Sequence, residues 1–220
     1  MTQEHYVDKD FGYFSHTRQD LISMLPAISG GRVLEIGCGR GHTLAEIKQK
    51  GFAAEVVGVE LMNLPRTQTE INAVDTYIVG NIETDSLALD DGSFDVVICG
   101  DVLEHLNDPW AAMQKIKRLV KPGGALVASV PNVREARTLY NLIIRGDFAY
   151  TEAGVLDRTH LRFFCKKNIL SLLTGAGGQV ERLSSDLKFK SNWRSRLDRL
   201  TFGWLQEFLV TQYLVVVRMA

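Results

Sequence analysis

Apolar runs alternate along the chain with stretches whose apolar residues recur at helical spacing. Apolar runs predict strands at 32–36, 55–59, 76–79, 94–99 and 125–130. Helical patterns lie between or after these runs, at 44–50, 68–72, 109–120 and 133–144. This alternation predicts βαβ units and a parallel sheet with helices on both faces. The runs lack a clean apolar–polar alternation, which fits strands buried on both sides.

The C-terminal part of the chain departs from this alternation. Residues 179–183 and 213–218 predict strands, and residues 193–208 predict a helix. Residues 146–164 carry little periodicity, and a loop of that length is uncommon unless it has a function or is disordered. We expect one domain over residues 1–220, with 146–164 as a cap on the active site and 188–209 as an added helical segment.

Composition narrows the class of protein. The chain has 220 residues, of which 45% are hydrophobic, and this suits one globular core. A formal net charge of −1 supplies no basic field, so we expect no nucleic-acid partner. No apolar run approaches the roughly 20 residues of a membrane span, and the polar, acidic start is unlike a signal peptide. Cys38, Cys99 and Cys165 predict free thiols, hence a cytoplasmic location.

A glycine-rich turn follows the first predicted strand, in the stretch VLEIGCGRGH. Ligands of open parallel sheets bind beyond the carboxyl ends of the strands, where this turn is expected. The glycines Gly37, Gly39 and Gly41 are spaced G-x-G-x-G, which differs from the nicotinamide fingerprint. Glu35 would repel a pyrophosphate and attract an ammonium or sulfonium group. Glu60, at the end of the second strand, can accept from ribose hydroxyls. A nucleoside with a cationic tail, S-adenosylmethionine, fits both acids.

Further motifs in chain order resemble those of class I S-adenosylmethionine-dependent methyltransferases. The motifs are VLEIGCGRG, VVGVE ending at Glu60, GNIE at 80–83, FDVVICGDVLEHL at 94–106 and LVKPGGALVASVPN at 119–132. The resemblance covers nearly the whole chain. It implies an α/β, Rossmann-like, doubly wound sheet of seven strands, mostly parallel with an antiparallel last strand.

The resemblance also implies roles for individual residues. Glu35 is expected to bind the ammonium group of the cofactor, and Glu60 its ribose. Asn81 stands where the family more often has Asp, although its carbonyl can still accept from the adenine amine. Arg18 either folds over the cofactor carboxylate or is an exposed, solvated arginine. The expected cofactor-binding set is Arg18, Glu35, Gly37, Cys38, Gly39, Gly41, Glu60, Leu61, Asn81, Ile82, Gly100 and Asp101.

The methyl acceptor is expected to be a hydroxyl group. The Asn-Pro-Pro-aromatic run often found in enzymes that methylate base or amide nitrogen is absent after the fourth strand. A hydroxyl requires a general base, for which histidine is suited. His160 is one candidate, in DRTHLRFF, and His105 is the other. Their structural alternatives are a loop pinned by His160 with Asp157, and a helix start at His105.

The segments DRTHLRFF and VPNVREARTLYNLIIRGDFAY resemble methyltransferases of the ubiquinone type and those found with surface-glycan enzymes. This favours O-methylation of a small molecule or of a glycan or lipid precursor. Arg158 or Arg162 would bind an anionic group of the acceptor, or pair with a local acid instead. Asn132 and Tyr150 are expected to line the acceptor site with them.

Several alternatives stay open at this stage. A small-molecule N-methyltransferase and a non-catalytic module that binds the cofactor are possible, and a dinucleotide-dependent oxidoreductase is disfavoured by Glu35. No cluster of histidine and acidic residues has evident metal-ligand spacing. Asp101 and Glu104 could bind Mg²⁺, but two carboxylates near a helix start are more often caps and dipole partners, so no metal is expected. Residues 188–209 mix basic and aromatic residues, which indicates a core-packing helix, a surface for anionic lipid, or a homodimer contact.

Overall fold

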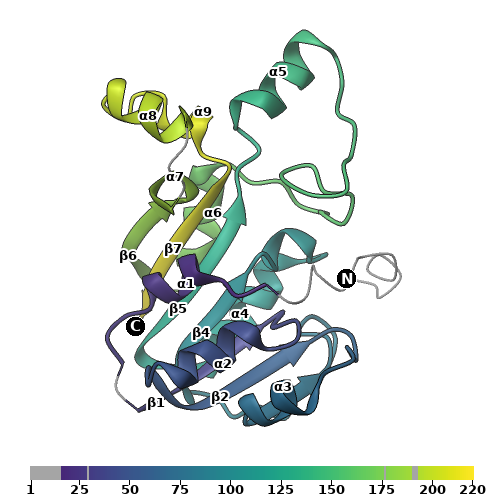
Figure 1. Cartoon of the computed structure of the whole chain (residues 1–220), viewed down its shortest axis with the longest axis vertical. Coiled ribbons are helices and arrows are strands. Elements are labelled where there is room, and N and C mark those ends of the chain that lie inside the picture. The colour runs from purple at the N-terminus through teal and green to yellow at the C-terminus, as the bar shows by residue number, and fades with distance from the viewer. Residues whose placement is uncertain (1–15, 29, 176, 190–192) are drawn as a thin grey trace.

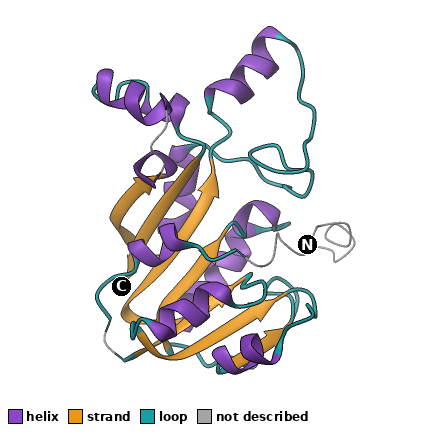
Figure 2. Ribbon diagram, viewed as in Figure 1, coloured by secondary structure: helices purple, strands orange, loops and turns teal. Residues whose placement is uncertain are grey.

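A mixed β-sheet forms the centre of the molecule in the computed structural model, which describes residues 16–28, 30–175, 177–189 and 193–220. Seven strands of the described chain are arranged in the order β3-β2-β1-β4-β5-β7-β6 (Figures 1 and 2). The strands are β1 Gly31–Ile36, β2 Ala53–Glu60, β3 Thr76–Val79, β4 Phe94–Gly100, β5 Val120–Pro131, β6 Gly178–Ser185 and β7 Gln212–Met219. Strand β7 is antiparallel to both of its neighbours, and the other pairings are parallel. The expected sheet is therefore confirmed.

Helices cover both faces of this sheet. Apolar residues of α1 and α2 pack with one face, and those of α4 and α6 pack with the other. The helices are α1 Gln19–Met24, α2 His42–Gln49, α3 Gln68–Ala73, α4 Pro109–Leu119, α5 Ala136–Ile144, α6 Lys166–Thr174, α7 Asp186–Phe189, α8 Trp193–Leu200 and α9 Gln206–Leu209, with a 3₁₀ turn, η3, at Leu103–His105. Among them, no helix of the described residues is long and apolar enough to cross a membrane.

The central strands are apolar on both faces because each face has its own core. In β1, Val33 contributes to the core beneath α1 and α2, whereas Leu34 contributes to the core beneath α4 and α6. In β4, Ile98 and Cys99 divide in the same way. Successive side chains of a strand point to opposite faces, so a doubly covered strand buries apolar residues on both faces rather than at alternate positions only.

The structure corrects the helix expected over residues 193–208. The chain there forms α8 and α9, and turns separate the two. Phe202 and Gly203 have φ angles of 49° and 78°, in the left-handed region that a right-handed helix cannot contain. Residues 190–192 of the expected 188–209 segment lie outside the described residues. Helices α1 and α6 are additions that the hydrophobic pattern did not reveal.

The chain between α5 and α6 is a long loop, as expected. Helix α5 extends away from the sheet, and the loop returns from it toward the ends of the central strands (Figure 1). Isolated bridges pair Thr151 with Asp157 and Asn132 with Phe164. The second bridge fastens the end of the loop beside the end of β5.

Candidate functional site

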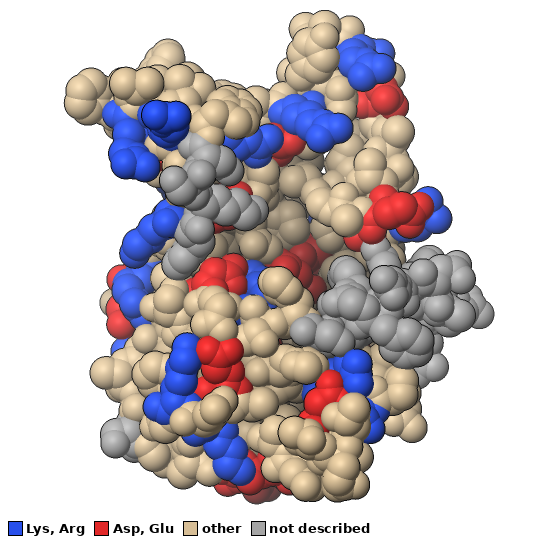
Figure 3. Space-filling view, in the orientation of Figure 1, with Lys and Arg blue, Asp and Glu red and all other residues tan. Residues whose placement is uncertain are grey.

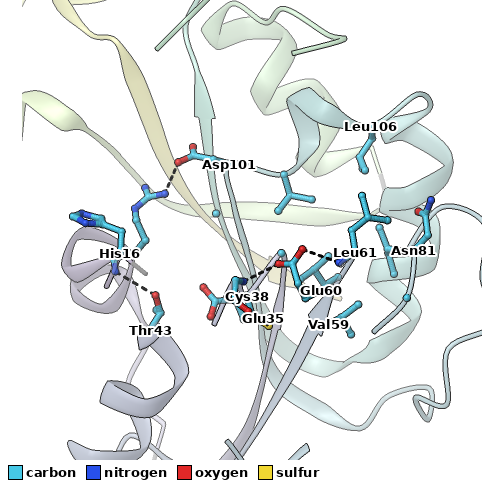
Figure 4. A pocket seen from close by; sticks show the side chains of 18 residues that line it. His16, Glu35, Cys38, Thr43, Val59, Glu60, Leu61, Asn81, Asp101 and Leu106 are labelled. Atoms are coloured by element: carbon cyan, nitrogen blue, oxygen red, sulfur yellow. Dashed lines mark hydrogen bonds and ion pairs between the residues drawn. The ribbon is translucent and has the colours of Figure 1, made fainter. Parts of the chain in front are cut away.

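A cavity of about 450 Å³ lies where the first four strands end (Figure 4). Strand β1 is flanked by β2 and β4, so the order of strands along the chain reverses at this point, and ligands of such sheets bind there. The lining residues are His16, Arg18, Glu35, Ile36, Gly37, Cys38, Gly39, Thr43, Val59, Glu60, Leu61, Gly80, Asn81, Ile82, Gly100, Asp101, Val102 and Leu106.

The glycine turn forms the floor of this cavity between β1 and α2. Gly37, Gly39 and Gly41 have φ angles of 71°, 54° and 89°, which L-residues with a Cβ rarely adopt. A Cβ on Gly37 would lie 2.6 Å from Cγ2 of Val102. A Cβ on Gly41 would lie 2.7 Å from Cγ2 of Val74, so the turn needs glycine for its backbone angles and, at Gly37 and Gly41, for space as well.

Glu60 fastens the turn to the end of β2. Its Oε2 accepts from the backbone N–H of Gly39 at 2.8 Å, and its Oε1 accepts from the N–H of Leu61 at 2.8 Å (Figure 4). Burial raises the pKa of Glu60, and these backbone hydrogen bonds oppose the rise. Oε1 also accepts from the N–H of Met62 at 3.4 Å, whereas Oε2 has a second lone pair with which Glu60 can still accept from a hydroxyl of a ligand.

Glu35 is a buried acidic side chain with one oxygen that accepts no hydrogen bond from the described residues. It is 4% exposed, and its Oε2 has no hydrogen-bond partner among the described residues. Burial raises its pKa to about 8, the charge of Arg18 opposes this, and the charge of Glu60 adds to it. A ligand ammonium group beside Oε2 would supply the missing donor and charge. The pocket thus fits the nucleoside with a cationic tail that the sequence predicts.

Arg18 lines the cavity, and its side chain is mostly buried rather than exposed. Its Nη1 donates to Asp101 at 2.5 Å, its Nη2 donates to Asp20 at 2.9 Å, and its side chain is 17% exposed. Burial lowers the pKa of Arg18, but Asp101 and Asp20 raise it well above its ordinary value. Ser129 donates to Asp101 at 3.0 Å. This network holds the carboxylate of Asp101 at the end of β4, where its φ angle is 55°.

The remaining cofactor-binding candidates occupy different parts of the cavity. Leu61, Asn81 and Ile82 lie at the end away from Asp101, and Figure 4 shows Leu61 and Asn81 together there. Gly100 lines the end that contains Asp101. Cys38 lines the cavity too, but it also belongs to the core beneath α1 and α2, and a Cβ on Gly58 would lie 2.6 Å from its Sγ. Cys38 therefore contacts strand β2 through its sulfur and also lines the cavity in which a ligand would bind.

The two histidine candidates lie together, although 55 positions separate them. Their ring centroids are 4.7 Å apart, and both rings are buried. Nδ1 of His105 is 3.0 Å from the carbonyl oxygen of Thr159, and Nδ1 of His160 is 3.0 Å from that of Val155. Burial and then the charge of His160 lower the pKa of His105 to about 4. His105 is therefore a neutral imidazole at physiological pH.

A buried carboxylate, Glu104, completes this group. It is 1% exposed, and its Oε1 lies 4.0 Å from Nε2 of His160. Its backbone carbonyl accepts from the N–H groups of Leu161 and Arg162 at 2.8 and 2.9 Å. These two bonds dock the long loop on the turn that follows β4. The tertiary structure thus brings together Glu104, His105 and His160, with ligand-type atoms within 4.8 Å of one another, a grouping that the sequence spacing did not predict.

The four acceptor candidates each have partners of their own within the described chain. Asn132 is 1% exposed, and its Nδ2 donates to the carbonyls of Glu207 and Val210 at 2.8 and 2.9 Å. This gives Asn132 a structural role in place of the expected acceptor contact. Arg158 pairs with Glu152 on the surface.

The other two candidates lie on the loop that Glu104 holds. The guanidinium of Arg162 donates to the carbonyls of Leu161, at 3.1 Å, and Asn107. In these contacts the guanidinium of Arg162 binds backbone carbonyls and forms no ion pair with an acidic side chain. Tyr150 is 53% exposed and stacks edgewise on Phe148 at 5.9 Å.

Some residues of the site were not anticipated from the sequence. His16 and Thr43 line the cavity, and the Thr43 hydroxyl accepts from the backbone N–H of Arg18 at 3.2 Å. Gln212 of the last strand donates to Asp101. Thr43 follows the glycine turn closely and could have been found from that position. Gln212 carried no such signal, because it reaches the site only through the antiparallel pairing of β7.

Comparisons with known proteins agree on one family. A sequence profile described as a methyltransferase domain matches residues 10–183. The ubiquinone biosynthesis O-methyltransferase of Xanthomonas oryzae pv. oryzae strain PXO99A is 36% identical over 185 residues, which cover 81% of this chain and 74% of that protein.

Two solved structures share the fold. An S-adenosylmethionine-dependent methyltransferase from Archaeoglobus fulgidus is 18% identical, with a TM-score of 0.61 over 98% of this chain and 97% of that one. Phosphoethanolamine N-methyltransferase 2 of Haemonchus contortus, in complex with S-adenosylmethionine, is 18% identical, with a TM-score of 0.59 over 92% of this chain and 52% of that one. At these identities the likeness establishes the fold alone.

Proposed function

Because this chain belongs to the family of class I S-adenosylmethionine-dependent methyltransferases and uses that compound as its cofactor, we propose that it methylates a hydroxyl oxygen. The acceptor is a small molecule or a glycan or lipid precursor. The similarity to an enzyme named as an O-methyltransferase supports this acceptor class. When bound, the cofactor supplies a methyl group on a positively charged sulfur.

We place the cofactor along the cavity from Ile82 to Asp101. Glu35 binds its ammonium group, because the Oε2 atom lacks a donor within the described chain. Glu60 holds its ribose while fastening the glycine turn. Leu61 and Ile82 pack against the adenine. The reacting methyl group then lies near Asp101, since the adenine occupies the other end of the cavity, beside Leu61 and Ile82.

The acceptor site adjoins this end of the cavity. Val102 and Leu106 line the cavity on either side of the turn that carries Glu104 and His105. Methyl transfer forms a C–O bond while the C–S bond breaks, and the hydroxyl proton must leave. The buried group Glu104, His105 and His160 is the observation that supports the proposal, because it holds two imidazoles beside the turn between Val102 and Leu106, and an imidazole can accept a hydroxyl proton. The chain otherwise aligns the reactants and excludes water.

The test is transfer of a trideuteromethyl group from labelled cofactor to matched acceptors. We would offer catechols, phenols and sugars beside the corresponding amines, and locate the label by mass spectrometry. Label on oxygen supports the proposal, and it should fall at least tenfold in His160→Gln while the affinity for S-adenosylhomocysteine is kept. Label on amines alone would make the chain an N-methyltransferase. Cofactor binding without any transfer would indicate a non-catalytic module.

We further propose that the α8–α9 end of the molecule rests on an anionic lipid surface, where a lipid-linked acceptor would be found. Large apolar side chains are exposed there: Leu200 is 76% exposed, Phe202 98% and Trp204 85%. Figure 3 shows Lys and Arg side chains beside this end of the molecule. Exposed aromatic residues with a basic surround are typical of peripheral membrane contact. The free thiols of Cys38, Cys99 and Cys165 fit a cytoplasmic location for that contact.

Co-sedimentation with vesicles tests this contact. We expect binding to vesicles rich in phosphatidylserine, weaker binding to phosphatidylcholine, and at least a fivefold loss in Phe202→Ser with Trp204→Ser. The control is Ile71→Ser, at an exposed apolar residue of α3 far from this end. Failure to bind anionic vesicles, together with a dimer by light scattering that the double variant dissociates, would assign the surface to a homodimer instead.

A further inference from the structure

A second cavity lies beside the ends of β6 and β7, apart from the cofactor cavity. Its volume is about 400 Å³, and the two cavities share no lining residue within the described chain. Strands β6 and β7 and helices α7, α8 and α9 contribute to its lining, and Figure 1 shows α7 and α8 beside the end of β6. Sites for small molecules commonly have volumes of about 300–1,000 Å³. The second cavity is therefore large enough for a small ligand.

Two oxygen atoms of residues that line the second cavity are buried without a partner. Tyr213 is 1% exposed, and its hydroxyl has no hydrogen-bond partner among the described residues. Oδ1 of Asp198 is also buried, and it likewise has no partner there. Buried polar groups are nearly always hydrogen-bonded, because leaving them without a partner destabilises the fold. A ligand that bonds to both atoms would remove this cost.

The two atoms require different partners. Burial raises the pKa of the Tyr213 phenol, and the charge of Glu207 adds to the rise, so the hydroxyl keeps its hydrogen and can donate to a ligand oxygen. An ionised carboxylate only accepts, so Oδ1 of Asp198 needs an O–H or N–H group of the ligand. Ser185, which is buried and lines the same cavity, has a hydroxyl that can do either. A ligand with several hydroxyl groups meets all three requirements.

The rim of the second cavity is cationic. Lys188 of α7 and Arg199 of α8 line the cavity and are exposed. Two cations at an opening attract an anion, and an arginine guanidinium binds phosphate oxygens well. The side chain of Leu187 and the ring of Tyr213 offer apolar surface to the C–H groups of the same ligand. Hydroxyl-binding groups inside and cations at the rim together fit a sugar that carries a phosphate.

Strand β7 connects the second cavity with the cofactor cavity. Asp186, the first residue of α7, accepts from the backbone N–H of Thr211 at 3.1 Å and from its hydroxyl at 2.6 Å. The next residue, Gln212, donates through its side chain to Asp101 in the cofactor cavity. The residue after that is Tyr213, and side chains of consecutive strand residues point to opposite faces. A ligand that fixes α7 and Tyr213 therefore also fixes the residue that holds Asp101.

We propose that the second cavity binds a phosphate ester of a sugar, and that its occupation strengthens cofactor binding. Tyr213 and Asp198 bind the hydroxyls of this ligand, and Lys188 and Arg199 bind its phosphate. Once the start of β7 is ordered, the cofactor has less left to order, which makes the coupling favourable. By linkage, the cofactor strengthens binding of the sugar phosphate by the same factor. The proposal does not depend on which atom of the acceptor is methylated.

Calorimetry with glucose 1-phosphate as the probe tests the site. We expect one molecule bound per chain, with affinity at least fivefold weaker in Tyr213→Phe and at least tenfold weaker in Arg199→Gln. Tyr213→Phe removes a hydroxyl that has no partner in the described chain, so its melting temperature should not fall. The controls Tyr140→Phe, at an exposed tyrosine of α5, and Arg196→Gln, on α8 but outside the described lining, should bind as the native chain does.

The proposed site is overturned if glucose 1-phosphate, glucose 6-phosphate and fructose 6-phosphate all fail to bind. Equal affinity for inorganic phosphate would also overturn it, because surface cations alone would then account for the binding. With saturating probe, affinity for S-adenosylhomocysteine should rise at least threefold in the native chain and stay unchanged in Tyr213→Phe. No rise in the native chain would overturn the coupling. Sedimentation with phosphatidylinositol vesicles that glucose 1-phosphate displaces would support the site and assign the ester to a lipid headgroup.

Discussion

Glu35 is a carboxylate that folding buries before any ligand is present. Its pKa is raised to about 8 chiefly by burial, so near neutral pH the side chain retains a proton in the folded protein. A ligand ammonium group would expel that proton because an ion pair favours the charged carboxylate. The residue therefore links cofactor binding to pH.

We expect the affinity for S-adenosylhomocysteine to rise by up to about tenfold per pH unit below pH 8 and then to level off. Calorimetry in buffers of different ionisation enthalpy should detect proton release on binding. In Glu35→Gln the pH dependence should vanish and the affinity near pH 8 should fall about 10- to 100-fold, since a charged hydrogen bond is lost. A flat profile in the native chain would contradict this role of Glu35.

Glu35 is expected to make the folded chain less stable as pH rises, whereas it makes ligand binding stronger. The folded chain binds more protons than the unfolded chain between the ordinary pKa of 4.5 and the folded value of about 8. The contribution of Glu35 to the free energy of unfolding therefore falls as pH rises through this window. Urea unfolding of the native chain and of Glu35→Gln at pH 5 and pH 8 should show that the variant gains relative stability at the higher pH.

The side chain of Asn132 attaches α9 to the end of β5. Its amide donates to two carbonyls near α9, and it sits at the end of β5. Asn132→Ala leaves these acceptors without donors, so we expect the free energy of unfolding to fall by about 2–4 kcal/mol. Affinity for S-adenosylhomocysteine should be unchanged. The control Asn72→Ala, on the exposed face of α3, should change the free energy of unfolding by under about 0.5 kcal/mol.

The glycine turn is the element whose geometry is most restrictive. Gly37→Ala introduces both a strained φ of 71° and a contact of 2.6 Å with Val102, whereas Gly51→Ala introduces only a strained φ of 73° in open space. We expect urea unfolding to show a loss of about 1 kcal/mol for Gly51→Ala and about 2–4 kcal/mol for Gly37→Ala. Only Gly37→Ala should lose cofactor affinity. Equal effects of both changes would refute the steric argument.

At the scale of the whole molecule, the pocket is assembled from many elements. Strands β1, β2 and β4, helix α2, the residues just before α1 and the residues just after β3 all contribute to the lining, so the site exists only in the folded chain. A ligand of such a site stabilises the fold by mass action. S-adenosylhomocysteine at one hundred times its dissociation constant should raise the free energy of unfolding by about 2.7 kcal/mol. NAD at the same concentration should leave the melting curve unchanged, and stabilisation by NAD would reject the cofactor assignment.

The sequence by itself determined the sheet, the glycine turn and the acids beside it. These features are local: the apolar runs of doubly covered strands, the glycines that positive φ angles require, and acids at fixed offsets from strand ends. Local signals survive in a one-dimensional pattern because neighbouring residues share one element.

Only the tertiary structure decided which distant side chains meet. It joined Arg18 to Asp101 and broke the helix expected over 193–208. It also brought His160 against Glu104 and His105. That last meeting depends on the path of a long loop and on two backbone bonds to the carbonyl of Glu104. No periodicity encodes such a path, since a loop is positioned by its contacts with the folded body rather than by its own pattern.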